Sequence, residues 1–185
     1  MAASSENEVH TMRNRSKRAA DTPYCAAVIV AAGSSSRMGA DKLLMELRGR
    51  PVIERTMLAF ENSRYIDEIV VVTQGEKIPV VANIARENGM QKLRSVITGG
   101  ADRTASSWAG VQECSPHAGI IAIHDAARPL VTDEIIKNAV KAAQERGAAA
   151  PAIHVKDTVR QARGGRVLRT LERDELYLMQ TPQVF

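Results

Sequence analysis

Strand-like and helix-like patterns alternate along the chain from Tyr24 onward. Continuous apolar, β-branched runs are typical of buried strands, and they predict strands over residues 24–32, 66–74, 93–100, 119–127 and 148–155. Apolar residues at helical spacing predict helices over residues 51–63, 78–89, 104–114 and 132–147. This alternation predicts an α/β fold with a doubly wound, mostly parallel sheet and helices on both faces.

The predicted helices carry recognisable boundary residues. In the last helix, Thr132 is the expected N-cap and Gly147 the expected end. Gly89 is the expected end of the second helix, and Thr104 or a nearby serine is the expected N-cap of the third. These signals place most of the chain in one domain, over residues 24–185.

The pattern changes near residue 156, where two short extended runs flank Gly164 and Gly165. Such a glycine pair between short runs predicts a β-hairpin. We expect residues 156–178 to project from the core as a dimerisation arm. An ordinary hairpin at the edge of the sheet remains open from the sequence alone.

The first 23 residues are polar and mix basic with acidic side chains. They hold no apolar segment of the kind found in secretory signals, so residues 1–23 are interpreted as a disordered tail. Glu6, Glu8 and Asp21 argue against an organelle transit peptide, which favours a bacterial cytoplasmic protein over a plastid one. Cys25 and Cys114 have no metal-ligand spacing and are expected to be reduced thiols in the core.

Composition and charge narrow the classes of partner. Hydrophobic residues make up 44% of the chain and aromatic residues only 3%, which suits a sheet buried on both faces. The net charge is only +4, and the tyrosines are not interleaved with basic residues, so a nucleic-acid partner is not expected. No apolar run is long enough to span a bilayer, so no membrane partner is expected.

Candidate chemistry follows the predicted strands. Segments 33–42, 99–107, 124–129 and 156–158 each come after a strand, and open α/β sheets bind ligands beyond the carboxyl ends of their strands. The first segment begins with small residues whose backbone amides can form an anion nest. Arg37 and Lys42 follow and are suited to phosphate oxygens, although a serine-rich turn with two surface cations remains open.

Five segments carry resemblances to known families. The segment "AAGSSSRMGADK" resembles nucleotidyltransferases that join a sugar or alcohol phosphate to a nucleotide, and also the molybdenum-cofactor guanylyl- and cytidylyltransferases. The segment "HDAARP" resembles the cytidylyltransferases that act on 2-C-methyl-D-erythritol 4-phosphate (methylerythritol phosphate) in non-mevalonate isoprenoid synthesis. The segments "GGADRTASSWAG", "VKDTVR" and "LMQTPQVF" match that family in order, so the resemblance covers about residues 25–185. Ala127 favours this family over the ribitol-5-phosphate cytidylyltransferases, which more often carry valine in the motif.

The resemblance implies a Rossmann-like nucleotidyltransferase with a protruding β-arm, acting as a homodimer. It implies transfer of a cytidylyl group from CTP to methylerythritol phosphate, with Mg²⁺ held mainly by the CTP phosphates and without a metal site built from protein side chains. A phosphate oxygen is already an anion at neutral pH, so the attack on the α-phosphorus requires no general base. Positioning and charge neutralisation are therefore the expected means of catalysis.

The resemblance also assigns roles to individual residues. It gives catalytic roles to Arg37 and Lys42, while His124 is expected to be structural. The residues expected to bind the nucleotide are Ala31, Ala32, Gly33, Ser34, Ser35, Ser36, Gly99, Gly100, Arg103, Ser106, Asp125 and Ala126. The residues expected to bind the acceptor substrate are Asp125, Arg128, Thr158, Arg173 and Thr181.

This sequence departs from the family pattern at three points. Some members carry an acidic residue where Ala101 stands, and many have a longer gap between the residues matching Arg37 and Lys42. Members also continue past the position of Phe185 into an Asn-Ile-Lys-x-Thr segment whose lysine contacts the sugar phosphate. We therefore expect weakened binding of methylerythritol phosphate. The alternatives are an enzyme for ribitol 5-phosphate or another sugar phosphate, and an inactive CTP-binding fragment.

Overall fold

The computed structural model describes residues 23–33 and 41–185. The strands are β1 (Cys25–Val30), β2 (Glu46–Leu47), β3 (Arg50–Pro51), β4 (Glu68–Thr73), β5 (Leu93–Thr98), β6 (Ile120–Asp125), β7 (Ala152–His154), β8 (Arg160–Arg163), β9 (Arg166–Thr170), β10 (Tyr177–Met179) and β11 (Gln183–Val184). The α-helices are α2 (Val52–Glu61), α3 (Ile78–Glu87), α4 (Arg103–Glu113) and α5 (Asp133–Arg146), and two short 3₁₀ helices are η1 (Gly75–Lys77) and η2 (Arg173–Glu175).

Within the described residues, the main sheet has five strands in the order β11-β6-β1-β4-β5. The pairs β1–β4, β1–β6 and β4–β5 are parallel, and only β11 runs antiparallel, against β6. The central strand β1 is apolar throughout, because both of its faces are covered. The predicted doubly wound, mostly parallel sheet is confirmed.

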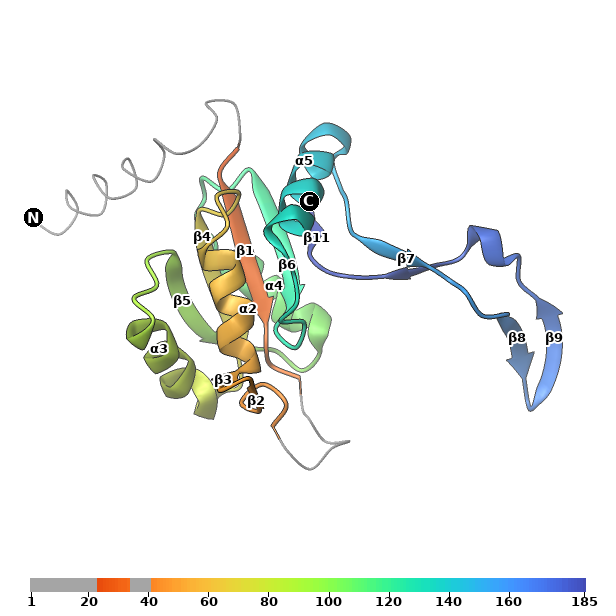
Figure 1. The fold of residues 1–185 in the computed structure, drawn as a ribbon, viewed down its shortest axis with the longest axis horizontal. Coiled ribbons are helices and arrows are strands. Elements are labelled where there is room, and N and C mark those ends of the chain that lie inside the picture. The colour runs from red at the N-terminus through yellow and green to blue at the C-terminus, as the bar shows by residue number, and fades with distance from the viewer. Residues whose placement is uncertain (1–22, 34–40) are drawn as a thin grey trace, which may run out of the picture.

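Successive residues of β1 point to opposite faces of the sheet and enter different cores. Cys25, Ala27 and Ile29 pack in the core that includes buried residues of α2, α3 and α5. Ala26 and Val28 pack in a smaller core beside Cys114, at the end of α4. The helices therefore cover both faces of the sheet, as Figure 1 shows. Among the described residues, no helix is both long and apolar enough to cross a bilayer.

The boundary predictions for the last helix are confirmed, and one for the third helix is wrong. The Oγ1 atom of Thr132 accepts a hydrogen bond from the amide of Ile135, and α5 ends at Gly147, whose φ is 86°. Helix α4, in contrast, begins at Arg103, and its N-cap is Asp102 rather than Thr104 or a serine. The Asp102 carboxylate accepts a 2.7 Å hydrogen bond from the amide of Ala105, which starts the helix one residue early.

The strand predicted over 148–155 does not join the main sheet. It is reduced to β7, which is exposed and pairs antiparallel with β10, while Ala149 forms an isolated bridge with Val184. Strand β11, which comes later in the chain than the arm, pairs with β6 instead. The apolar run over residues 148–155 therefore leads into the arm and does not form a further strand of the main sheet.

The predicted hairpin is confirmed. Strands β8 and β9 pair antiparallel around Gly164 and Gly165, whose φ angles of 55° and 76° lie in the left-handed region that favours glycine. Figure 1 shows β7, β8, β9 and β10 extending away from the main sheet. We use the term arm for residues 156–178 together with strand β7, which precedes them in the chain.

Candidate active site

A cavity of about 930 Å³ opens at the carboxyl ends of β1, β5 and β6. It lies where strand order reverses, since β4 and β5 extend the sheet to one side of β1 and β6 to the other. Open α/β sheets bind ligands at this kind of position. Its lining comes from residues 30–33, 42–43, 100–103 and 106, and 125, 127 and 128.

Nine of the fourteen predicted site residues that the structure describes line this cavity. Those that line it are Ala31, Ala32, Gly33, Lys42, Gly100, Arg103, Ser106, Asp125 and Arg128. Ser34, Ser35, Ser36 and Arg37 lie outside the described residues. Gly99 and Ala126 adjoin lining residues without lining the cavity, and Thr181 is buried.

The fourth predicted segment, residues 156–158, does not reach this cavity. Thr158 follows β7, and Arg173 begins η2, so both lie on the arm. The Arg173 guanidinium donates to the carbonyl oxygen of Lys156 at 3.3 Å. Residues 156–158 therefore lie away from the other three segments, because β7 pairs with β10 outside the main sheet and begins the projecting arm that the sequence predicts.

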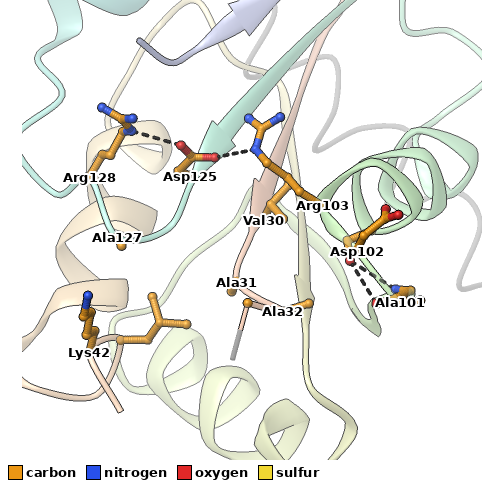
Figure 2. A pocket seen from close by; sticks show the side chains of 14 residues that line it. Val30, Ala31, Ala32, Lys42, Ala101, Asp102, Arg103, Asp125, Ala127 and Arg128 are labelled. Atoms are coloured by element: carbon orange, nitrogen blue, oxygen red, sulfur yellow. Dashed lines mark hydrogen bonds and ion pairs between the residues drawn. The ribbon is translucent and has the colours of Figure 1, made fainter. Parts of the chain in front are cut away.

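The carboxylate of Asp125, at the carboxyl end of β6, accepts hydrogen bonds from two arginines. Its Oδ1 accepts a 2.9 Å hydrogen bond from Nε of Arg103, and its Oδ2 accepts a 2.9 Å hydrogen bond from Nε of Arg128. Figure 2 shows the two guanidinium groups on either side of this carboxylate. Burial raises the pKa of Asp125, but the hydrogen bonds from Arg128 and Arg103 and their charges outweigh it and hold the pKa below its ordinary value.

Lys42 supplies a third cation to the cavity wall. The preceding residue anchors its backbone: Asp41 accepts from the amide of Leu43 at 3.1 Å and forms a 2.8 Å ion pair with Lys77 of η1. Within the residues that the structure describes, Lys42 itself is exposed and forms no ion pair. Its ammonium group adds positive charge to the wall of the cavity, which suits an anionic ligand.

The glycines after β5 permit a close approach of chain segments. A Cβ on Gly99 would lie 2.3 Å from Cβ of Ala32, so only glycine allows the ends of β5 and β1 to approach this closely. The amide of Gly99 donates to the carbonyl of Thr73 at 2.8 Å, and the amide of Gly100 donates to Oγ of Ser106 at 3.1 Å. Both amides are therefore engaged within the protein.

The segment after β6 rests on a buried hydrogen-bond network. Thr181 Oγ1 lies 3.3 Å from the amide of Asp125 and 2.9 Å from Nδ1 of His124, and Nε2 of His124 lies 3.1 Å from the carbonyl of Arg128. A carbonyl oxygen can only accept, so Nε2 carries the imidazole proton and the Thr181 hydroxyl donates to Nδ1. The structure thus gives His124 the structural role expected for it. The buried Thr181 stabilises this segment through its hydrogen bonds to Asp125 and His124.

Sequence reasoning missed two polar residues near the cavity. Oε1 of Gln183 accepts a 3.2 Å hydrogen bond from Nη2 of Arg103, and Oε1 of Gln180 accepts one from Nη1 of Arg128. Both lie in the segment "LMQTPQVF", in which the family resemblance implies a role for Thr181 but none for the glutamines.

The donor set of the cavity suits an anion. No group of three or more His, Cys, Asp or Glu side chains that suits a metal ion occurs in residues 23–33 and 41–185. Both oxygens of Asp125 already accept from guanidinium groups, and the carboxylate of Asp102 caps α4. The cations that line the cavity, Lys42, Arg103 and Arg128, therefore suit a phosphate-bearing ligand.

Comparison with known proteins gives the family. Residues 25–185 match the family described as "IspD: 2-C-methyl-D-erythritol 4-phosphate cytidylyltransferase". The chain is 42% identical over 164 residues to a protein of that name from Pelotomaculum thermopropionicum, covering 86% of this chain and 69% of the relative. It is 39% identical over 165 residues to one from Geobacter metallireducens, covering 86% of this chain and 71% of the relative.

The fold leads to the same family. The crystal structure of 4-diphosphocytidyl-2C-methyl-D-erythritol synthase from Anaerococcus prevotii superposes with a TM-score of 0.79 at 30% identity. The likeness covers 89% of this chain and 72% of that one. On its sequence and its fold, the chain belongs to the 2-C-methyl-D-erythritol 4-phosphate cytidylyltransferase family.

Proposed function

We propose that this protein transfers the cytidylyl group of CTP to the phosphate of 2-C-methyl-D-erythritol 4-phosphate. The products are 4-diphosphocytidyl-2-C-methyl-D-erythritol and pyrophosphate, in isoprenoid precursor synthesis. The observation that carries the proposal is the convergence of Lys42, Arg103 and Arg128 on one cavity at the strand ends. The relatives named above act on methylerythritol phosphate by name, which favours this acceptor over ribitol 5-phosphate.

The chemistry follows from charge. A phosphate oxygen of the acceptor attacks the α-phosphorus of CTP, the bond from that phosphorus to the bridging oxygen breaks, and pyrophosphate leaves. The attacking oxygen is already ionised, so no side chain needs to remove a proton. Mg²⁺, bound through the phosphate oxygens of CTP, would supply further charge neutralisation. Lys42, together with Arg37 in the segment outside the described residues, neutralises the charge that builds up around the α-phosphorus.

We assign Arg103 and Arg128 to different substrates. Arg103, at the start of α4, lies on the same side of the cavity as Gly100 and Ser106 and is assigned to the nucleotide. Arg128, which follows β6, is assigned to the phosphate of the acceptor. Asp125 joins the two and fixes their separation, so that the two substrates are held in register for in-line attack.

The arm supports a homodimer. Six apolar side chains on the arm or directly after it are more than half exposed in the single chain: Ile153, Val167, Leu168, Tyr177, Leu178 and Met179. Such side chains on projecting strands are typical of a protein–protein interface. We propose that the arm packs on a second copy and brings Thr158 and Arg173 to the acceptor site of that copy. Leu178→Glu should then shift the protein from dimer to monomer in sedimentation velocity, whereas a monomeric wild-type protein would refute the dimer.

Pyrophosphate release tests the activity directly. The purified protein is incubated with Mg²⁺, each of the four ribonucleoside triphosphates, and either methylerythritol phosphate or ribitol 5-phosphate. Release that requires both CTP and methylerythritol phosphate supports the proposal. Release with ribitol 5-phosphate alone would change the acceptor. A thermal shift with CTP, without release for any acceptor, would leave the protein as a nucleotide-binding module.

Because CTP is made in the cytoplasm and the named relatives are bacterial, we propose the bacterial cytoplasm as the location.

A further inference from the structure

The segment that returns from the arm touches both arginines of the cavity. It runs from β10 through residues 180–182 to β11. Gln180, at its start, accepts from Nη1 of Arg128, and Gln183, at its end, accepts from Nη2 of Arg103. Each guanidinium therefore has one hydrogen bond to Asp125 through Nε and a second, through a different nitrogen, to a glutamine.

Two contacts on different nitrogens fix the plane of a guanidinium group. A single hydrogen bond to Asp125 would let Arg103 or Arg128 turn about the Nε contact, because both side chains are nearly half exposed, at 48% and 42%. The glutamine oxygen prevents this rotation and leaves the other N–H donors available. Guanidinium groups recognise phosphate through paired N–H donors in one plane, so a fixed plane is a prepared phosphate site.

Both glutamines are themselves held in place. Gln183 lies in β11, paired with Ile123 and followed by the fully buried Val184. The backbone amide of Gln180 donates to the carbonyl of Pro151 at 2.9 Å, and its Nε2 donates to the carbonyl of Leu178 at 3.2 Å. The contact at Nε2 fixes the side-chain amide so that Oε1 faces the arginine.

We propose that Gln183 and Gln180 are positioning residues, Gln183 for Arg103 on the nucleotide side and Gln180 for Arg128 on the acceptor side. This inference rests on the proposed function. Neither glutamine lines the cavity, so each acts through its arginine and not through the substrate.

Steady-state kinetics of four variants test the assignment. Methionine has nearly the length of glutamine but lacks the acceptor oxygen, whereas glutamate keeps that oxygen. Gln183→Met should raise KM for CTP about tenfold and leave KM for methylerythritol phosphate within about twofold, and Gln180→Met should do the reverse. Gln183→Glu and Gln180→Glu should recover most of each loss. Asn83→Leu, which removes an amide-to-arginine contact with Arg86 on the exposed side of α3, is the matched control and should change neither KM.

A double mutant separates positioning from direct binding. If Gln183 acts only through Arg103, the variant that combines Arg103→Met with Gln183→Met should have the kinetics of Arg103→Met alone. Additive losses would overturn the inference. So would equal effects of Gln183→Met and Gln180→Met on both KM values, or no effect on either, because the two glutamines would then have no separate arginine partners.

A measurement without substrates keeps this inference apart from the proposed function. In ¹⁵N-arginine spectra of the whole protein, the Nε–Hε signals of Arg103 and Arg128 should exchange slowly with water. Gln183→Met should speed exchange at Arg103 only, and Gln180→Met at Arg128 only. Failure of wild-type protein to join CTP and methylerythritol phosphate would refute the proposed function. Unchanged exchange in both variants would refute the positioning role, whatever the activity.

Discussion

The hydroxyl of Thr181 lies 2.9 Å from Nδ1 of His124, across 57 positions of sequence. The same oxygen accepts from the amide of Asp125 at 3.3 Å, so one threonine supports the residue that holds both cavity arginines. His124 continues the chain of hydrogen bonds to the carbonyl of Arg128 and contacts the ring of Phe60, with ring centroids 4.9 Å apart. The geometry of the cavity therefore depends on a buried hydrogen-bond network that joins Thr181, His124 and the backbone of Asp125 and Arg128.

Thr181→Val should destabilise the protein by about 2 kcal/mol, because valine keeps the shape but leaves Nδ1 of His124 and the amide of Asp125 without their partner. Thr181→Ser keeps the hydroxyl and should cost less than about 1 kcal/mol. Urea denaturation at pH 7 measures both. Equal losses for valine and serine would mean that packing of the methyl group, and not the hydrogen bonds, is what matters.

The stability of the protein should fall between pH 7 and pH 5 because of His124. Burial lowers the pKa of His124 to about 4, from its ordinary 6.5. Between these values the unfolded chain binds a proton that the folded chain does not, so the free energy of unfolding decreases as the pH falls. The contribution is about 2 kcal/mol between pH 7 and pH 5.

Urea denaturation at the two pH values, on wild type and on His124→Gln, checks this prediction. Glutamine keeps polar contacts but cannot ionise, so the variant should lose that part of the pH dependence. Asp125, whose pKa lies below its ordinary value, remains ionised across this range. The same slope in both proteins would assign the pH dependence to other groups.

Lys42→Ala should lower kcat about a hundredfold and change KM for CTP less than about threefold, because the charge that Lys42 neutralises develops in the transition state. The assay is pyrophosphate release at saturating and limiting CTP. Lys141→Ala, at an exposed position of α5, serves as the control for loss of a positive charge. An unchanged kcat, or a loss confined to KM, would remove Lys42 from the transition state.

Gly110→Ala should destabilise the protein by about 2 kcal/mol, although alanine ordinarily favours a helix over glycine. A Cβ at this position would lie 2.3 Å from Cγ1 of Val28 and 2.8 Å from Cγ2 of Val72, inside the contact between α4 and the sheet. Combining it with Val28→Ala should cost less than the sum of the two single changes, as denaturation of the three variants would show. Additive losses would place the clash elsewhere, and Gln112→Ala on the exposed side of α4 should have little effect.

Local signals in the sequence were sufficient for much of the fold. The apolar run of β1, the caps Thr132 and Gly147, and the glycine pair of the hairpin each act through nearby residues, and the structure confirms all of them. The segment over 148–155 contains a strand, as predicted, but an apolar run does not reveal which neighbour that strand will pair with. That pairing was decided by β10 and β11, which come later in the chain.

By itself, the sequence determined the alternating fold, the segments that carry chemistry and the family to which they point, because hydrophobic periodicity and short motifs are local properties. Only the tertiary structure decided that Asp125 binds Arg103 and Arg128 and that Gln183 and Gln180 complete the arrangement. These are contacts between segments far apart in sequence. Their geometry depends on how strands order themselves in the sheet, and no local pattern encodes that order.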